Sequence, residues 1–129
     1  MGSLVIFSVD VGRLATFYQA VLTASAVAEP SGDVRLSGER DEVLIHTVPA
    51  MVARNIVVSS PPAAREGSPI KPVFDVSSLD SVLDVVRANG GVVTDFHFVL
   101  DGLARHDVLD PDGNVIQLRA HTRSPEDES

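Results

Sequence analysis

The sequence predicts an α+β protein built from two βαβββ modules, and three observations indicate this fold class. Amphipathic helix patterns begin after Asp10 and again after Ser78, at an offset of roughly 68 residues. Short segments of alternating apolar residues surround each helix pattern. Near the C-terminus, residues 110–114 read Asp-Pro-Asp-Gly-Asn between two alternating segments, which is typical of a β-hairpin turn.

The length and composition of the chain limit the classes of protein to consider. The 129 residues suit one domain with a sizeable core, and 44% apolar with 22% charged residues are typical of a folded protein. The net charge of -8 argues against nucleic acid or an anionic membrane as partner, since both require basic patches. The chain has no cysteine, and its first residues carry no signal-peptide or membrane-spanning pattern. We therefore expect a cytoplasmic protein.

The first module is expected in residues 1–48. Residues 3–9 alternate and are rich in β-branched side chains, which predicts a strand. Asp10 is a suitable N-cap for the first helix, which ends near Thr23. Three strands follow, separated by turn clusters at 30–33 and 38–41. These three predicted strands are residues 25–28, 34–37 and 42–48.

A proline-rich connector, residues 49–69, joins this module to a second one at 70–121. A short strand at 56–58 is possible inside the connector. In the second module a strand at 70–76 precedes a helix that starts at Leu79 and stops at Gly90-Gly91. The remaining predicted strands are residues 92–93, 103–109 and 114–120. Residues 122–129 form an acidic tail that we expect to be disordered.

Three features of the sequence together resemble one known group of proteins. They are Phe17-Tyr18 in the helix after Asp10, the repeated module, and the segment 110–118, Asp-Pro-Asp-Gly-Asn-Val-Ile-Gln-Leu. In this combination the chain resembles the vicinal oxygen chelate superfamily, which includes glyoxalase I, bleomycin-resistance proteins and extradiol dioxygenases. The resemblance covers almost the whole chain. It implies two modules whose sheets form an open, cup-shaped barrel around a central cleft, commonly in a homodimer.

The same resemblance implies four cleft positions that hold the metal in metal-dependent members, occupied there by His, Glu or Gln. Carried over to this chain, these positions are Ser3, Leu44, Lys71 and Gln117. Only Gln117 could be a neutral ligand, since leucine cannot bind a metal and an ammonium group repels a divalent cation. We therefore expect no metal and no other cofactor. A shifted alignment would bring Glu42 or His46 to the place of Leu44, and this alternative stays open.

Alternation predicts which side chains share the cleft face. These are Glu42, Leu44 and His46, then Lys71, Val73 and Asp75, then Val115, Gln117 and Arg119. The other face is apolar and suits a core beneath two helices. The cationic and polar members of the cleft face suit an anionic or carbonyl-bearing small molecule, because desolvated cations strengthen hydrogen bonds to such oxygens. Lys71 could equally form a structural ion pair with Asp75 or Glu42.

The histidines and aromatic residues near the predicted cleft each have two interpretations. His46 is either a pocket residue or a half-buried histidine with a structural partner. His97 lies between Phe96 and Phe98 and either closes over the cleft or belongs to a loop. The direction of His106 depends on the strand boundaries. The ligand-binding candidates are therefore Lys71, Gln117, Arg119, His46, Phe96 and His97.

Two classes of function follow. The first is a metal-free small-molecule binding protein, similar to the resistance proteins that sequester a drug between two subunits, and it is the function that the sequence favours. The second is an enzyme, either an isomerase or lyase with His46 or Lys71 as general base, or a glyoxalase-like or dioxygenase-like metal enzyme if the ligand positions are shifted. Partners are then the ligand and a second copy of the chain, without nucleic acid or membrane.

Overall fold

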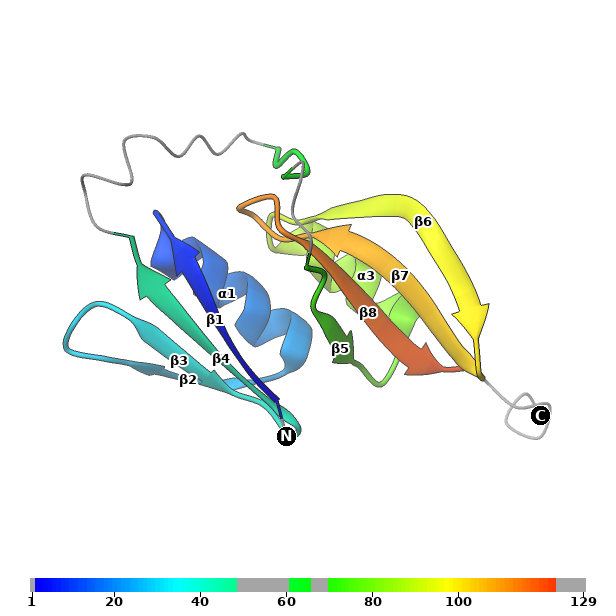
Figure 1. Cartoon of the computed structure of the whole chain (residues 1–129), viewed down its shortest axis with the longest axis horizontal. Coiled ribbons are helices and arrows are strands. Elements are labelled where there is room, and N and C mark those ends of the chain that lie inside the picture. Colours follow the sequence, from blue (N-terminus) through cyan, green and yellow to red (C-terminus); the bar gives the residue numbers. More distant parts are fainter. Residues whose placement is uncertain (1, 49–60, 66–69, 123–129) are drawn as a thin grey trace.

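A computed structural model describes residues 2–48, 61–65 and 70–122 of the chain. Both predicted modules are present in it, each with one helix and four strands (Figure 1). The first contains β1 (Gly2–Ser8), α1 (Val11–Leu22), β2 (Ser25–Ala28), β3 (Val34–Ser37) and β4 (Asp41–Thr47). The second contains β5 (Val73–Asp75), α3 (Leu79–Ala88), β6 (Val92–Leu100), β7 (Leu103–Leu109) and β8 (Val115–His121).

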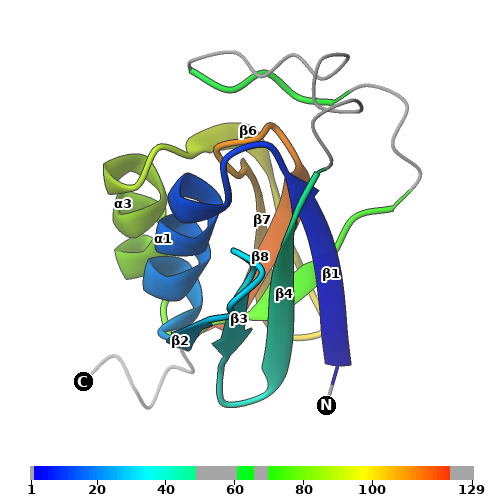
Figure 2. The same ribbon diagram turned by 90° about the vertical axis from the view of Figure 1, so that its left-hand side faces the viewer.

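Each module forms its own four-stranded mixed sheet. The strand orders are β1-β4-β3-β2 and β5-β8-β7-β6, so the first strand of each module pairs in parallel with the last. The two sheets do not close into a barrel, which fits the predicted open cup. Both helices lie on the same side of the sheets and contact each other (Figure 2), and in the part of the chain that the structure describes no helix covers the opposite side of the strands. We call this opposite side the helix-free face.

The two helices begin and end where the sequence predicts. The Asp10 carboxylate accepts a hydrogen bond from the Arg13 amide at 3.1 Å, and α1 stops at Thr23, which has a left-handed φ of 50°. The Ser78 hydroxyl accepts from the Ser81 amide at 3.4 Å and caps α3 in the same way. These caps satisfy amide groups that have no partner inside the helix.

One hydrophobic core lies between the helices and the sheets. Alternation along β1 places Leu4 and Ile6 against this core, whereas Val5 and Phe7 lie on the helix-free face. The prediction that one face of β4 and of β8 packs on the core is confirmed by the same pattern of burial. The fully buried side chains of the core include Leu14, Phe17, Tyr18, Leu36, Val43, Ile45, Val86, Val108, Ile116 and Leu118.

The β7–β8 turn of the second module packs against the first module through hydrogen bonds. The Tyr18 hydroxyl donates to the Asp110 carboxylate at 2.6 Å, and burial raises the pKa of both groups. The Asp112 carboxylate accepts from the Ser8 hydroxyl at 2.7 Å and from the Arg13 guanidinium at 3.1 Å. The turn of the second module is therefore bound to the corner between β1 and α1 of the first.

Some predicted elements differ from the structure. Residues 94–100 were expected outside strands, but they belong to β6, whose ladder with β7 is interrupted by an irregularity between Val93 and His97. Conversely, β5 is shorter than the predicted strand 70–76, and Pro72 directly before it has no amide hydrogen to donate. The possible strand at 56–58 and the tail from 123 on lie outside the described residues. Within the described ranges, no helix is long and apolar enough to cross a membrane.

Candidate functional site

A polar cluster lies on the helix-free face of the second sheet. Asp107 is 5% exposed and stands opposite Gln117 in the β7–β8 ladder. Its carboxylate accepts from the Lys71 ammonium at 2.6 Å and from the Gln117 side-chain amide at 3.1 Å. Lys71 therefore pairs with Asp107 and not with Asp75 or Glu42, the two partners that the sequence suggested. The structure does bring Lys71 and Gln117 together, as predicted.

Arg105 extends this cluster toward two exposed phenylalanines. Its guanidinium donates to the Gln117 amide oxygen at 3.3 Å and lies 5.9 Å from the centre of the Phe98 ring. The Phe96 ring packs edge to face on Phe98, with 5.5 Å between ring centres, and lies 5.0 Å from the Lys71 ammonium. Among the described residues the buried Nε of Arg105 has no hydrogen-bond partner, and no carboxylate contacts its guanidinium. Its positive charge is thus available to an acceptor from outside.

Arg119 lies on the same face, but its guanidinium is paired with the carboxylate of Asp75. Its Nε lies 2.6 Å from Asp75 Oδ1, and the two residues are register partners on β5 and β8. This hydrogen bond lowers the pKa of Asp75 and raises the pKa of Arg119. Arg119 is therefore held in a local ion pair with Asp75 on the predicted face.

His46 forms a separate pair on the first sheet. Its Nδ1 lies 2.8 Å from Oδ2 of Asp33, whose other oxygen accepts from the Thr47 amide at 2.9 Å. The hydrogen bond from His46 is the main cause that lowers the pKa of Asp33. The imidazole also stacks obliquely on Phe7, with 5.3 Å between ring centres. His46 has the structural partner that one of its two interpretations required, and its ring stays half exposed on the helix-free face.

The structure places His97 away from the candidate site. His97 stands opposite His106 in the β6–β7 ladder, and the two rings stack with 5.2 Å between centres. His106 in turn stands opposite the buried Leu118, on the side of the sheet that faces the helices. Because side chains alternate along a strand, Phe96 and Phe98 lie on the helix-free face and His97 on the other. The structure therefore does not bring His97 together with the other candidates.

Two cavities accompany these clusters. One of about 320 Å³ lies where β1 meets the start of β8, and its lining includes Phe7, Arg65 and Val115. The other, of about 600 Å³, lies between the β3–β4 turn and the start of α3. Of the six predicted ligand-binding residues, only Arg119 lines either of them. The Lys71 cluster is instead an open surface on the helix-free face.

Sequence reasoning missed three residues of these clusters, namely Arg105, Asp107 and Asp33. The register of each hairpin contains the missing signal. Counting back from the 110–114 turn pairs Asp107 with Gln117 and Arg105 with Arg119. Continuing the β3–β4 ladder by one residue beyond Val34 and Ile45 places Asp33 opposite His46.

Comparison with known proteins yields structural likeness only. No family model matches the sequence, and no curated protein is similar to it in sequence. A glyoxalase/bleomycin resistance protein/dioxygenase family enzyme from Burkholderia phytofirmans PsJN superposes with a TM-score of 0.70 at 19% identity, covering 93% of this chain and 97% of that one. A glyoxalase/bleomycin resistance protein from Albidiferax ferrireducens T118 gives 0.67 at 22% identity, with coverage of 95% and 98%. The fosfomycin resistance protein FosX from Listeria monocytogenes gives 0.68 at 14% identity, with coverage of 100% and 97%.

These likenesses and the paired βαβββ modules settle the architecture. The chain has the vicinal oxygen chelate fold. The suspected resemblance is confirmed at the level of the fold. Identities of this size carry no activity across.

Three of the four positions at which the resemblance implied a metal, namely Lys71, Gln117 and Leu44, offer no free ligand atom in this chain. Lys71 is bound to Asp107 at 2.6 Å, and both ends of the Gln117 amide are engaged, by Arg105 and by Asp107. Leu44, at the corresponding position of β4, offers no donor atom. Within residues 2–48, 61–65 and 70–122, no group of three His, Cys, Asp or Glu side chains is arranged to hold a metal.

Proposed function

We propose that this protein binds a small organic molecule with an anionic or carbonyl group on its helix-free face, without a metal ion. The observation that carries the proposal is the half-buried Arg105, whose guanidinium has an amide and a ring as neighbours and, among the described residues, no carboxylate partner. A carboxylate or enolate oxygen would accept hydrogen bonds from the terminal N–H groups of this guanidinium, and charge-assisted hydrogen bonds are the stronger class.

The neighbours of Arg105 indicate the shape of the ligand. Phe96 and Phe98 are exposed by 56% and 37%, respectively, which is unusual for large aromatic side chains outside a binding surface. Their rings would contact a flat apolar body, while Arg105 and the Gln117 amide orient its oxygen atoms. Lys71 contributes mainly through its ion pair with Asp107, which holds Gln117 in place. The ligand class that fits this surface best is an aromatic carboxylate.

Titration calorimetry with benzoate tests this proposal. Arg105→Gln should weaken binding about tenfold or more, because a hydrogen bond to a charged group contributes about 1.5–3 kcal/mol. Arg35→Gln is the matched control, since Arg35 lies on the other sheet and is paired with Glu42 at 2.7 Å. Benzyl alcohol, which lacks the charge, should bind far more weakly than benzoate. Equal affinities for wild type and Arg105→Gln would contradict the assignment of Arg105.

A second candidate function is general base catalysis, and the His46–Asp33 pair favours it. A carboxylate at 2.8 Å from Nδ1 orients the imidazole and leaves Nε2 to accept a proton from a substrate. Incubating phenylpyruvate with the protein in D2O would reveal abstraction of the proton next to the carbonyl as deuterium exchange by NMR. Exchange that His46→Gln removes would establish this enzyme, and no exchange above the protein-free rate would exclude this reaction.

The metal-free part of the proposal needs its own measurement. Protein purified without chelator or affinity tag should contain no stoichiometric metal, and Ni, Zn, Mn and Fe(II) should leave its melting temperature unchanged. Saturable stabilisation that His46→Ala removes would instead indicate a glyoxalase-like or dioxygenase-like metal enzyme. A homodimer and a cytoplasmic location complete the proposal.

A further inference from the structure

The two ends of the molecule are built alike but closed differently. At one end the β7–β8 turn fills the corner between β1 and α1, where Asp112 is held by Ser8 and Arg13. The same turn covers the end of α3, since a Cβ added to Gly90 would lie 3.8 Å from Pro111. The Pro111 ring and the Asp112 carboxylate therefore fill this end of the molecule, which we call the closed end.

At the other end the corresponding turn is shorter. The helix N-caps Asp10 and Ser78 are 68 positions apart, so the corner between β5 and α3 repeats the corner between β1 and α1. The corner between β5 and α3 faces the β3–β4 turn. This turn has only residues 38–40 between its strands, whereas the β7–β8 turn has residues 110–114. The hydrogen bond from the Gly38 amide to the Asp41 carbonyl, at 2.8 Å, holds this turn tight. A cavity of about 600 Å³ results, which we call the end cavity.

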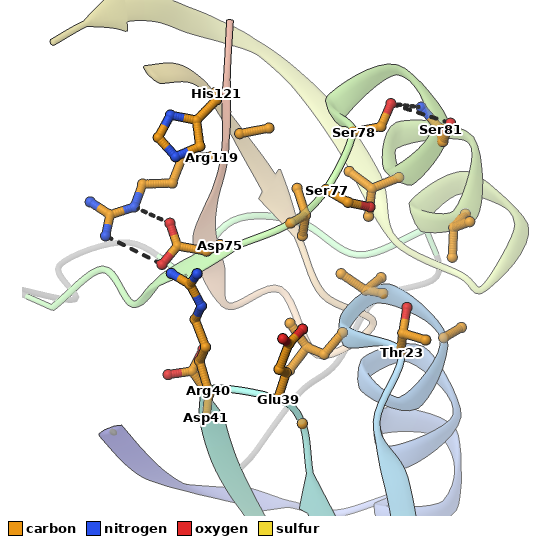
Figure 3. A pocket seen from close by; sticks show the side chains of 18 of the residues that line it. Thr23, Glu39, Arg40, Asp41, Asp75, Ser77, Ser78, Ser81, Arg119 and His121 are labelled. Carbon is orange, nitrogen blue, oxygen red and sulfur yellow. Dashed lines mark hydrogen bonds and ion pairs between the residues drawn. The ribbon is translucent and has the colours of Figure 1, made fainter. Parts of the chain in front are cut away.

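The walls of the end cavity combine an apolar floor with a charged rim (Figure 3). Val82 and Val85 of α3 and Ala20 of α1 supply apolar surface. On the rim, Asp75 and Arg119 pair with each other, while Arg40 reaches from the turn toward Asp75 and helps to lower its pKa. The rim and floor also include Thr23, Glu39, Asp41, Ser77, Ser78, Ser81 and His121.

We propose that the end cavity binds a small carboxylic acid with a compact apolar body, a ligand that reproduces what Pro111 and Asp112 do at the closed end. The apolar body would lie against Val82 and Val85. The carboxylate would lie beside Arg40, whose side chain points toward Asp75, while Ser81 lines the opposite, α3 side of the cavity (Figure 3). Ser81 occupies the position that corresponds to Arg13, which binds the Asp112 carboxylate at the closed end, so at this end the cation is Arg40 of the turn instead. A volume of 600 Å³ is in the range of small-molecule sites.

A titration of the wild-type chain with cyclopentylacetate, followed by amide NMR shifts, tests this inference. Saturable shifts are expected at Arg40, Ser77 and Ser81, and the neutral analogue cyclopentylacetamide should bind at least about tenfold more weakly, as expected for loss of a charge-assisted contact. Arg40→Gln should weaken binding by a similar factor. Ser81→Phe should abolish it, because the new ring fills the cavity while the backbone amide still donates to the Ser78 cap.

Three results would overturn the proposal: no saturable shift at these amides, equal binding of acid and amide, or binding unchanged by both substitutions. The inference does not rest on the proposed function of the helix-free face. Arg105→Gln, which tests that face, should leave cyclopentylacetate binding at the end cavity unchanged.

Discussion

Asp110 shows how a buried charge can support a fold. Its side chain is fully buried and accepts hydrogen bonds from Tyr18, from the Asp112 amide and from both the amide and the side chain of Asn114, all at 2.6–2.9 Å. Burial nevertheless raises the pKa of Asp110, so this group costs stability as the pH rises from its ordinary value of 3.8 through its folded pKa. Its donors are therefore essential.

The first prediction concerns the Tyr18 hydroxyl, which makes the shortest of these hydrogen bonds to Asp110. Tyr18→Phe should lower the free energy of unfolding by about 1–3 kcal/mol, the cost of leaving a buried acceptor short of a partner. Urea unfolding at neutral pH measures this loss. Thr16→Ala removes an exposed hydroxyl of the same helix, bound to the Gly12 carbonyl, and should change the stability by no more than about 0.5 kcal/mol. Similar effects of the two substitutions would contradict a special role for Tyr18.

Asp75 has the opposite pH dependence. Its hydrogen bond with Arg119 lowers its pKa from 3.8, so the unfolded chain binds the proton more tightly than the folded protein does. The stability that Asp75 contributes is complete above pH 3.8 and is lost as the pH falls through the folded pKa. The difference in unfolding free energy between wild type and Asp75→Asn should therefore be constant at higher pH and shrink in acid. A difference that does not vary with pH would contradict this, and Arg119→Gln should reduce the acid dependence in the same way.

At the scale of single elements, the hairpin turns show what sequence can predict. The turn residues and the alternation on both sides predicted the faces of β8 correctly, and Gly113 has the positive φ of 86° that the turn requires. The extent of β6 was not predicted, because the irregularity between Val93 and His97 interrupts its pairing, and because much of β6 is exposed and lacks a core-facing pattern. Long-range partners such as Lys71 and Asp107 depend on packing between β7 and the chain before β5, which no local pattern contains.

The loop between α3 and β6 leads to a prediction about Gly91. A Cβ on Gly91 would lie 2.6 Å from Phe17 and 2.7 Å from the Leu109 carbonyl, so the helix can approach the strands only with glycine there. Gly91→Ala should destabilise the protein by about 1–3 kcal/mol, the usual cost of overpacking. Gly12→Ala is the matched control, because its Cβ would meet nothing closer than 4.0 Å and alanine favours the helix. Unfolding midpoints should move in opposite directions, and a neutral Gly91→Ala would show that the contact relaxes.

At the scale of the whole molecule, repetition of a module explains both its closed end and its end cavity. The repeat was visible in the sequence as the offset between Asp10 and Ser78. The difference between the two ends follows from the lengths of the two turns. The β3–β4 turn, residues 38–40, is shorter than the β7–β8 turn, residues 110–114, and cannot reach as far. The volume between the modules could not be predicted, because it depends on how α1 and α3 pack against each other.

The helix-free face leads to the last prediction. Val5 and Phe7 of β1 are exposed by 51% and 59%, respectively, and β1 is an edge strand of its sheet. Exposed apolar side chains on a sheet edge favour association with another chain. We therefore expect light scattering to give twice 13.7 kDa, or 27.4 kDa, and Val5→Lys to shift the protein toward the monomer on dilution. Val99→Lys, at a side chain 64% exposed on the opposite face of β6, should leave the dimer intact. A wild-type mass of 13.7 kDa at every concentration would mean that one chain alone forms the ligand surface around Arg105.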